Sequence, residues 1–230
     1  NFDDNIISFA PLGHRFVNHI WKLLSSLHIP YITLLDLDVG RDGGGWGRIK
    51  YALQQLIHLG IDRNTLLTLR DGTILTDENF DKMHTWIYEN NKLDALMWWV
   101  DRLKEYDILY SSPLDIDYLM LEHYPKIYKK AIPENGGPRI PKKNEDPEKF
   151  ATKVENAVVA TLKSENAKGE TYTETQRELM IWYNYHFLGR GKPVTHMNAL
   201  ALMDNENIKE NMPPVLVEIF DKIGKILHKK

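Results

Sequence analysis

The order of apolar and polar positions divides the chain into an α/β first part and a helical second part. Ile6 to Phe9 is a short apolar run that predicts a strand, and apolar residues then recur at helical spacing from Phe16 to Leu27. Pro30 ends that helix. Tyr31 to Leu35 is a continuous β-prone run, as is Asp107 to Ser112, and such runs are typical of parallel strands buried on both faces. The sequence thus predicts a mostly parallel sheet flanked by helices.

The remaining pattern predicts the domain organisation. Leu66 to Leu69 indicates one more strand, and helices are expected near residues 49–57, 77–104 and 114–130. A stretch rich in proline and glycine predicts an exposed loop over residues 131–145. Beyond it the pattern is helical, over about 146–164, 172–188, 194–203 and 214–227. We predict an α/β core over residues 1–130 and a helical part over residues 146–230 that packs on it.

Composition narrows the class of protein. The 230 residues are 43% hydrophobic and 27% charged, as in folded globular chains, and a formal net charge of -3 excludes a uniformly basic nucleic-acid binder. The absence of cysteine excludes disulfides, thiolate zinc sites and a cysteine nucleophile. No apolar run approaches the roughly 20 residues of a membrane span, so we expect a cytoplasmic protein without membrane contact. The chain opens on Asn1 rather than Met, and we expect it to be part of a longer protein.

Two aspartates close the run that begins at Tyr31. Residues two apart in a strand point to the same face, so Asp36 and Asp38 can reach one ion. Open α/β sheets bind ligands at the carboxyl ends of their strands, where this pair lies. Oxygen ligands favour Mg²⁺ or Mn²⁺ over zinc. The alternative is a pair of solvated turn residues, but the apolar run before the pair favours a metal site.

A second acid pair follows the second long strand. Asp115 and Asp117 come after the segment Ser111-Ser112-Pro113-Leu114. Two such pairs, each closing a strand, are a stronger signal for a metal site than one. The alternative is that Asp115 caps the helix that follows, a role that does not exclude metal binding.

A lysine near the C-terminal helices is the candidate for binding a phosphate. Lys192 precedes Pro193, which suits the first position of a helix, and a lysine at a helix N-terminus forms an anion site. The alternative is an ordinary surface lysine in a glycine turn. The spacing is not that of a Walker loop. The nine histidines show no His-x-x-x-His spacing, which disfavours zinc.

A glycine-rich loop directly follows the first acid pair, over residues 40–48. Its glycines would let a phosphate backbone approach, while Arg41, Arg48 and Lys50 supply positive charge. The alternative is a flexible connection between a strand and a helix. Its place next to the acid pair favours substrate contact.

The ordered set of these motifs resembles the Toprim nuclease half of OLD-family (overcoming lysogenization defect) ATP-dependent endonucleases. The resemblance extends from about residue 5 to about residue 225 and rests on four segments: Tyr31-Ile32-Thr33-Leu34-Leu35-Asp36-Leu37-Asp38, Gly43-Gly44-Gly45-Trp46-Gly47-Arg48-Ile49-Lys50, Leu114-Asp115-Ile116-Asp117 and Gly191-Lys192-Pro193. Members of this family join an N-terminal ABC-type ATPase to a Toprim domain that cuts or nicks DNA with two metal ions. Many relatives act in anti-phage defence.

The resemblance implies a role for each site residue. Asp36 and Asp38 would be the Toprim Asp-x-Asp ligands, Asp115 and Asp117 would complete the second metal site, and Lys192 would stabilise the transition state. The implied partners are DNA, two Mg²⁺ or Mn²⁺ ions and an upstream ATPase domain that binds ATP. One departure is clear, because the family's first strand and its glutamate do not precede Asp36, and we expect both upstream of Asn1.

Two other functions stay open at this stage. Asp36-Leu37-Asp38-Val39 also resembles the first motif of haloacid-dehalogenase-like phosphatases, with Asp36 as nucleophile and Asp38 as general acid. That family's final acidic pair after the lysine is missing, and the second Asp-x-Asp would have no role. The other alternative is a non-catalytic interaction module. Homodimerisation is compatible with six tryptophans and exposed helices, but the sequence does not require it.

Overall fold

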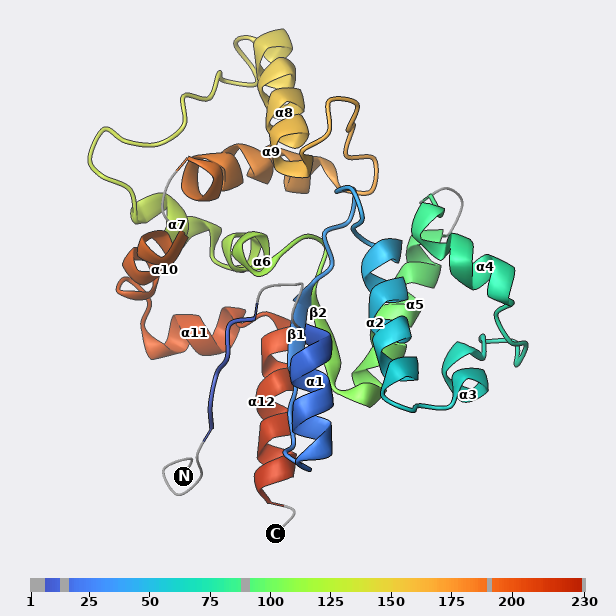
Figure 1. Cartoon of the computed structure of the whole chain (residues 1–230). Coiled ribbons are helices and arrows are strands. Elements are labelled where there is room, and N and C mark those ends of the chain that lie inside the picture. Colours follow the sequence, from blue (N-terminus) through green and yellow to red (C-terminus); the bar gives the residue numbers. More distant parts are fainter. Residues whose placement is uncertain (1–6, 13–16, 88–91, 190–191, 229–230) are drawn as a thin grey trace.

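The computed structural model describes residues 7–12, 17–87, 92–189 and 192–228 and has the predicted α/β character. Strand β1 (Thr33–Asp36) pairs in parallel with β2 (Ile108–Ser111), and Asp36 lies opposite Ser111. Helices account for most of the remaining chain. Figure 1 shows the two strands in the middle of the molecule with helices on both sides.

The helices surround this small sheet. In chain order they are α1 (Val17–Ser26), α2 (Trp46–His58), α3 (Arg63–Leu67), α4 (Asp77–Lys82), α5 (Lys92–Leu103), α6 (Ile116–His123), α7 (Pro125–Lys130), α8 (Pro147–Leu162), α9 (Glu174–Tyr183), α10 (Lys192–Leu200), α11 (Asn205–Asn211) and α12 (Pro214–Leu227). Two 3-10 turns, η3 (Met83–Thr85) and η4 (Lys104–Tyr106), follow α4 and α5. A π-helical turn, η5 (Asn184–Leu188), continues α9.

Short polar side chains start many of these helices. A helix N-terminus leaves backbone N–H groups without partners, and an Asp or Thr before the first turn can accept from them. Thr173 forms a full capping box with Gln176 at α9. Single caps come from Asp62, Thr76, Asp115, Asp146 and Asp204. The role of Asp115 as a cap, expected as an alternative, is therefore confirmed.

One apolar core joins the two halves of the chain. The indole of Trp21 in α1 stacks beside Tyr31, with ring centroids 6.5 Å apart, and donates to the Thr33 hydroxyl of β1 at 2.9 Å. The same core cluster includes residues from the sheet region and from α8, α9 and α10. The Tyr118 hydroxyl of α6 donates to the carbonyl of Gln176 in α9 at 2.9 Å. The C-terminal helices thus pack directly on the segment that follows β2.

Some predicted elements differ in the structure. Leu66 and Leu67 are not in a strand but in α3, where the Asp62 cap starts a helix that buries both leucines. Ile7 to Phe9 forms no strand, and Phe9 is 81% exposed; Ile6 lies outside the described residues. The helix expected over 114–130 is divided in two where Pro125 begins α7.

The long helix expected over residues 77–104 is also divided, into α4, η3 and α5, with residues 88–91 outside the described part of the chain. Helix α11 was not predicted, because its sequence is mostly polar and lacks apolar periodicity. The remaining predicted helices and both long strands are present within a few residues of their expected ends.

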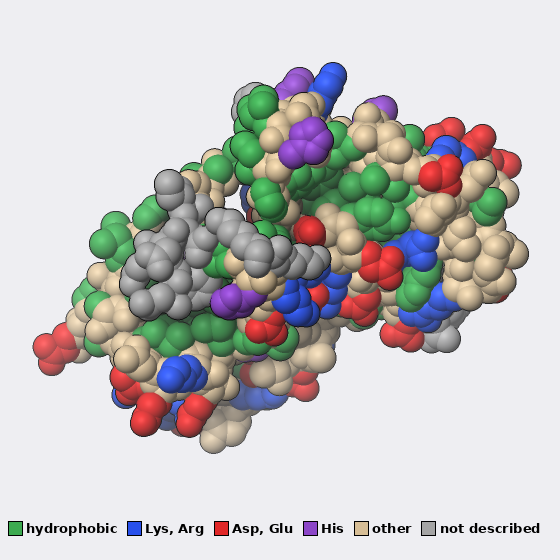
Figure 2. All heavy atoms as spheres, turned by 90° about the horizontal axis from the view of Figure 1, so that it is seen from below, with side chains coloured by type: hydrophobic (Ala, Val, Ile, Leu, Met, Phe, Trp, Pro, Cys, Tyr) green, Lys and Arg blue, Asp and Glu red, His purple; other side chains and the backbone are tan. Residues whose placement is uncertain are grey.

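The two strands differ in burial. All of β2 is buried, whereas β1 is half-buried and its last residue is exposed, so the expectation that both strands are buried on both faces is wrong for β1. Among the described residues no strand pairs with the other edge of β1. Helix α12 lies against β2, yet none of its residues 214–227 is fully buried. Figure 2, viewed from below, shows hydrophobic side chains at the surface among charged ones.

Substitution of two glycines would test how backbone conformation affects the free energy of unfolding. Gly224 lies inside α12 and Gly72 lies in a turn with φ +83°, and an added Cβ would meet no atom within 4 Å at either position. We expect Gly224→Ala to raise the free energy of unfolding by roughly 0.5–1 kcal/mol, because alanine favours a helix interior. Gly72→Ala should lower it by about 1 kcal/mol, because its φ is unfavourable for alanine. Chemical denaturation measures both, and equal effects of the two changes would contradict this explanation.

Candidate active site

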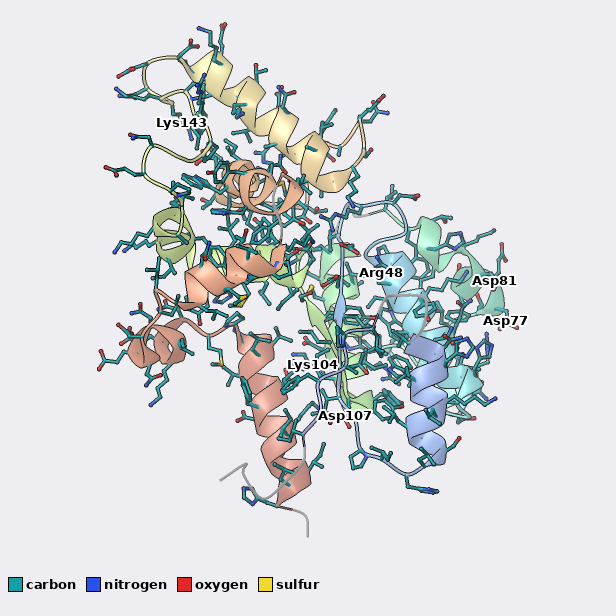
Figure 3. All side chains as sticks on the ribbon, turned by 60° about the vertical axis from the view of Figure 1, so that its left-hand side comes forward. Arg48, Asp77, Asp81, Lys104, Asp107 and Lys143 are labelled. Carbon is teal, nitrogen blue, oxygen red and sulfur yellow. The ribbon has the colours of Figure 1, made fainter. Side chains whose placement is uncertain are left out.

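The parallel pairing of β1 and β2 brings the two acid pairs to the same end of the sheet. The pairing continues past the strands, where the backbone N–H of Asp38 donates to the carbonyl of Leu114 at 2.8 Å and that of Val39 to Pro113 at 2.9 Å. Figure 3 shows Arg48 near this end of the strands and Asp107 near the other. The carboxyl end of the sheet is therefore where the predicted site residues meet.

The glycine-rich loop holds Asp38 in an unusual backbone conformation. Asp38 has φ +55°, a left-handed conformation that aspartate tolerates better than most residues. Gly44 lies against it so closely that a Cβ at Gly44 would be 1.8 Å from the Asp38 carbonyl oxygen. The N–H of Gly45 donates to the carbonyl of Leu37 at 2.6 Å. The loop is thus a fitted turn around Asp38, and glycine is required at position 44.

Two arginines bind the Asp38 carboxylate. Arg41 donates to one oxygen and Arg48 to the other, each at 2.6 Å. Arg48 reaches Asp38 from the first turn of α2, which starts directly after the glycines. Asp38 is buried, so the two guanidinium groups compensate a charge that would otherwise be costly to bury.

Arg41 also connects Asp38 to the second acid pair. Its Nη1 lies 3.0 Å from Asp115, its Nη2 donates to the Tyr183 hydroxyl at 2.9 Å, and its Nε donates to the carbonyl of Thr161 at 3.0 Å. The Tyr183 hydroxyl in turn donates to Asp115 at 2.6 Å. Burial and the nearby Asp115 charge raise the pKa of Tyr183 above its ordinary range, which keeps this hydroxyl a donor.

Asp36 keeps one carboxylate oxygen without a hydrogen bond among the described residues. Its Oδ1 accepts from the Ser111 hydroxyl at 2.9 Å and from the N–H of Ile116 at 3.2 Å. The residue reaches the surface, but protein atoms crowd its carboxylate. This partial burial raises the pKa of Asp36, the hydrogen bond from Ser111 opposes it, and the charges of Asp115 and Asp38 add to the increase. Negative charge at this end of the sheet is therefore not fully balanced.

Asp117 binds a separate pair of groups. One of its oxygens accepts from Lys192 and the other lies 2.8 Å from Nε2 of His196, whose Nδ1 lies 2.6 Å from the Tyr128 hydroxyl. Burial alone would raise the pKa of Asp117, but the hydrogen bonds from His196 and Lys192 outweigh it and hold the pKa below its ordinary value. Asp117 is therefore ionised with a hydrogen bond on each oxygen, and Lys192 is anchored on it.

The structure brings together most of the predicted site residues. Asp36, Asp38 and Asp115 lie near one another with Arg41 and Arg48, and Asp117 lies with Lys192. Lys50 does not join them, because its amine lies 2.6 Å from the carbonyl of Asp81 and 3.2 Å from His84. Lys192 is the first residue of α10, one position earlier than Pro193 had suggested, and Gly191 lies outside the described residues.

The carboxylates do not form a ready metal cluster in this arrangement. Within the described ranges, no group of three or more His, Asp or Glu side chains has the geometry to hold an ion. The oxygens of Asp38, Asp115 and Asp117 are occupied by the cationic, hydroxyl and backbone donors described above. The predicted metal site remains a prediction, and Asp36 is the carboxylate best placed to accept an ion.

Sequence reasoning missed three residues of this network. Tyr183 and His196 lie 9 and 4 positions from Lys192, and Tyr128 lies 11 positions after Asp117. His196 carried a signal, since it is four residues after Lys192 at the start of a predicted helix and therefore on the same face. The two tyrosines carried none, because only the packing of α7 and α9 brings them to the acids.

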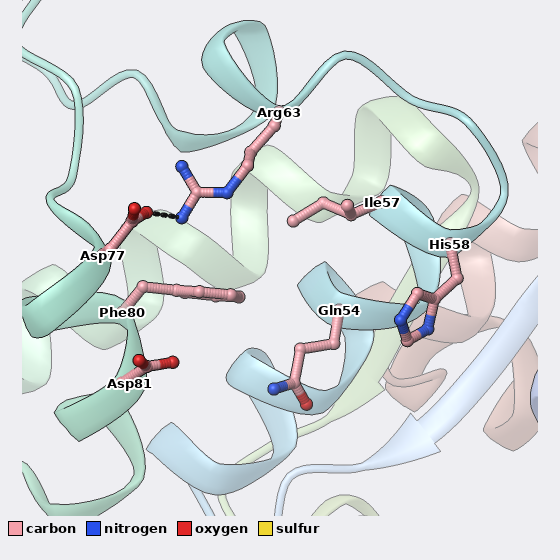
Figure 4. A pocket seen from close by; sticks show the side chains of 7 residues that line it. All are labelled: Gln54, Ile57, His58, Arg63, Asp77, Phe80 and Asp81. Atoms are coloured by element: carbon pink, nitrogen blue, oxygen red, sulfur yellow. Dashed lines mark hydrogen bonds and ion pairs between the residues drawn. The ribbon is translucent and has the colours of Figure 1, made fainter.

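A separate hollow of about 360 Å³ lies between α2, α3 and α4. Figure 4 shows Arg63 paired with Asp77 over this hollow, with Phe80 and His58 on its walls. The guanidinium group of Arg63 lies 5.7 Å from the centre of the Phe80 ring. None of the aspartates of the two acid pairs lines it, so the hollow is distinct from the candidate site.

Comparison with known proteins adds no family to this picture. No family model, curated protein or solved structure matches the chain. Among the described helices, none is both long enough and apolar enough to cross a membrane.

The fitted turn around Asp38 gives a direct test. Gly44→Ala places a methyl group against the Asp38 backbone, so we expect the free energy of unfolding to fall by about 1–3 kcal/mol as the loop shifts. The matched control is Gly47→Ala, three residues along, where an added Cβ would meet its nearest neighbour only at 4.0 Å. Thermal unfolding measures both; a Gly44→Ala protein as stable as Gly47→Ala would show that the close approach does not exist.

Proposed function

We propose that this chain is a metal-dependent DNA endonuclease or nickase, and that it forms the Toprim-like nuclease part of an OLD-family ATPase–nuclease. The observation that carries the proposal is the convergence of two Asp-x-Asp pairs at the carboxyl end of two paired parallel strands, with Lys192 held on the second pair. Parallel α/β sheets place their sites at this end. The order of these motifs along the chain supports the family assignment.

The donor set suits a hard divalent ion. The site offers carboxylate oxygens and no thiolate, which favours Mg²⁺ or Mn²⁺. Asp36 has an oxygen without a hydrogen bond among the described residues and lies close to two other acids, so a cation there would relieve their repulsion. Asp38 and Asp115 would complete the ligand set after release of their present partners, and Asp117 would add a ligand through a remaining oxygen lone pair while it keeps Lys192 and His196. In such sites a divalent ion activates water and stabilises the leaving oxygen of a phosphodiester.

The basic residues would act on the phosphate. Arg41 and Arg48 now bind carboxylates, and guanidinium groups bind phosphate with the same bidentate geometry. Lys192 lies at the first position of α10, where the helix N-terminus adds to its positive field. This lysine would offset charge that develops on the phosphate oxygens during in-line attack. DNA, an ATPase domain of the same protein and a role in anti-phage defence belong to this proposal.

The geometry favours a nuclease over the phosphatase alternative. As a phosphatase general acid, Asp38 would have to carry a proton, yet both of its oxygens accept hydrogen bonds from guanidinium groups. A phosphatase would also leave the second acid pair without a function. Phosphate release from small esters, or an acyl-phosphate on Asp36, would establish the phosphatase instead.

The activity test uses supercoiled plasmid and the intact protein. We expect nicking that depends on Mg²⁺ or Mn²⁺ and that falls by about 100-fold or more in Asp38→Ala, Asp117→Ala and Lys192→Ala, because each removes a charge from the reacting centre. Lys142→Ala is the matched control for the lysine, since Lys142 is an exposed residue whose one ion pair within the described part of the chain is with Glu145. Undiminished cutting by all three variants would rule out this site.

Metal binding can also be tested without catalysis. The raised pKa of Asp36 means that its charge opposes folding at neutral pH, and that this cost declines as pH falls through the folded-state pKa and is lost below the ordinary pKa of 3.8. Asp36→Asn should therefore raise the metal-free melting temperature at pH 7, and the gain should shrink on acidification. Mg²⁺ or Mn²⁺ should stabilise the wild-type protein and not the variant. Equal stabilisation of both proteins by the ions would contradict binding at Asp36.

A further inference from the structure

We infer that His196 and Tyr128 are positioning residues that hold the amine of Lys192 in place through Asp117. The inference rests on the proposed function in one respect, the action of Lys192 on phosphate. The observation is a continuous chain of contacts from Tyr128 in α7 to His196 in α10, to Asp117 in α6, and back to Lys192 in α10. Neither His196 nor Tyr128 touches the carboxylates of the first acid pair in any described contact.

The Asp117 carboxylate determines the direction of the hydrogen bond that it shares with His196. An ionised carboxylate only accepts, so Nε2 of His196 must carry the proton that it shares with Asp117. A neutral imidazole then presents Nδ1 as an acceptor, and the Tyr128 hydroxyl can donate to it at 2.6 Å. Burial raises the pKa of Tyr128 above its ordinary range, so this hydroxyl keeps its proton. The contact with Asp117 thus fixes which edge of the imidazole faces the carboxylate.

Packing fixes the same orientation independently. The His196 ring stacks on Phe187 with centroids 5.1 Å apart and meets the edge of Tyr128 at 5.8 Å. Tyr128 is itself fully buried. Aromatic rings thus hold the imidazole that contacts Asp117. Residues that contact a metal ligand from outside the site orient it in the same way in other proteins.

Lys192 needs this support. Its side chain is 50% exposed, whereas that of Asp117 is only 8% exposed. A lysine amine on a flexible four-carbon stem is poorly positioned without a fixed partner. Of the two Asp117 oxygens, His196 occupies one and leaves the other for Lys192. The helical spacing of four residues between Lys192 and His196 lets both reach the same carboxylate.

A purely structural role is the competing explanation, because the same contacts join α6, α7 and α10. Such a role predicts that loss of His196 lowers stability and leaves the state of Lys192 unchanged. Positioning predicts that Lys192 itself becomes more reactive and that turnover falls more than DNA binding does. These two outcomes are measured separately.

The variants are His196→Ala, His196→Gln and Tyr128→Phe in the intact protein. His196→Gln keeps an amide donor that can reach Asp117, and Tyr128→Phe removes only the outer hydroxyl. His123→Ala is the matched control, because His123 also bonds across a helix junction, from α6 to the carbonyl of Asn211 at 3.1 Å, away from Lys192. Unfolding curves confirm that each variant is folded under the assay conditions.

The first measurement is acetylation of Lys192 by an acetylating reagent in metal-free protein, followed by mass spectrometry with Lys142 as internal reference. We expect His196→Ala to raise the Lys192 rate severalfold, Tyr128→Phe to raise it less, and His196→Gln and His123→Ala to stay near wild type. The second is plasmid nicking, where kcat should fall about tenfold or more in His196→Ala with KM little changed. His196→Gln should recover part of that kcat.

The outcomes separate the two proposals. An unchanged Lys192 acetylation rate in folded His196→Ala overturns the positioning role, whatever the nicking result. Increased acetylation in a protein whose wild type does not nick DNA supports the anchoring of Lys192 and overturns the nuclease proposal. Increased acetylation together with a loss of kcat supports both.

Discussion

The geometry of the site depends on the hydrogen bonds that the guanidinium group of Arg41 donates. This group binds Asp38 after β1, Asp115 before α6, the Thr161 carbonyl in α8 and the Tyr183 hydroxyl in α9. These partners lie up to 142 positions from Arg41 in the sequence. A planar group with five donors in a rigid fork can satisfy such a set, whereas the ammonium of lysine cannot. Arg41 therefore connects the two strand ends to the C-terminal helices.

This network is not in itself a source of large stability. Burial of ion pairs costs desolvation that their attraction only partly offsets, and apolar residues of the same volume often serve as well. Four aspartates face three Arg and Lys side chains, Arg41, Arg48 and Lys192. One negative charge is left without a cationic partner, and the raised pKa of Asp36 indicates that this carboxylate is the one least stabilised in its charged form. Charge arranged at such a cost is characteristic of functional sites.

The sequence predicted the coarse α/β fold and the position of the two acid pairs within it. Two apolar runs, each followed by an acid pair, predicted β1 and β2. Because the strands are parallel, their carboxyl ends lie at the same edge of the sheet, and the two acid pairs meet there. Leu66 and Leu67 were predicted to lie in a strand, because a run of four mostly apolar residues is too short for its periodicity to distinguish a strand from a helix. In the structure, the Asp62 cap starts a helix that includes both leucines.

Contacts between distant segments were beyond prediction. Tyr183 and Tyr128 reach the site only through the packing of α9 and α7, and no local pattern marks a tyrosine whose partner lies 68 positions away. Lys50 was predicted to bind phosphate because it is close to Arg48 in the sequence. Residues two apart on a helix face different directions, and the Lys50 amine donates to the carbonyl of Asp81 instead. His196 was within reach of prediction through its spacing from Lys192.

The present pairing also explains how metal and DNA binding would be linked under the proposed function. Asp38 cannot serve an ion fully while Arg41 and Arg48 occupy both of its oxygens, and the two arginines cannot bind phosphate while they stay on Asp38. An ion that takes the carboxylate frees the guanidinium groups, and a phosphate that takes the guanidinium groups frees the carboxylate. Each ligand therefore favours the state that the other requires, and by linkage the two affinities rise together. Under the proposed function, the arginines would hold Asp38 and Asp115 in the metal-free protein and would turn the same positive charges to the substrate when it binds.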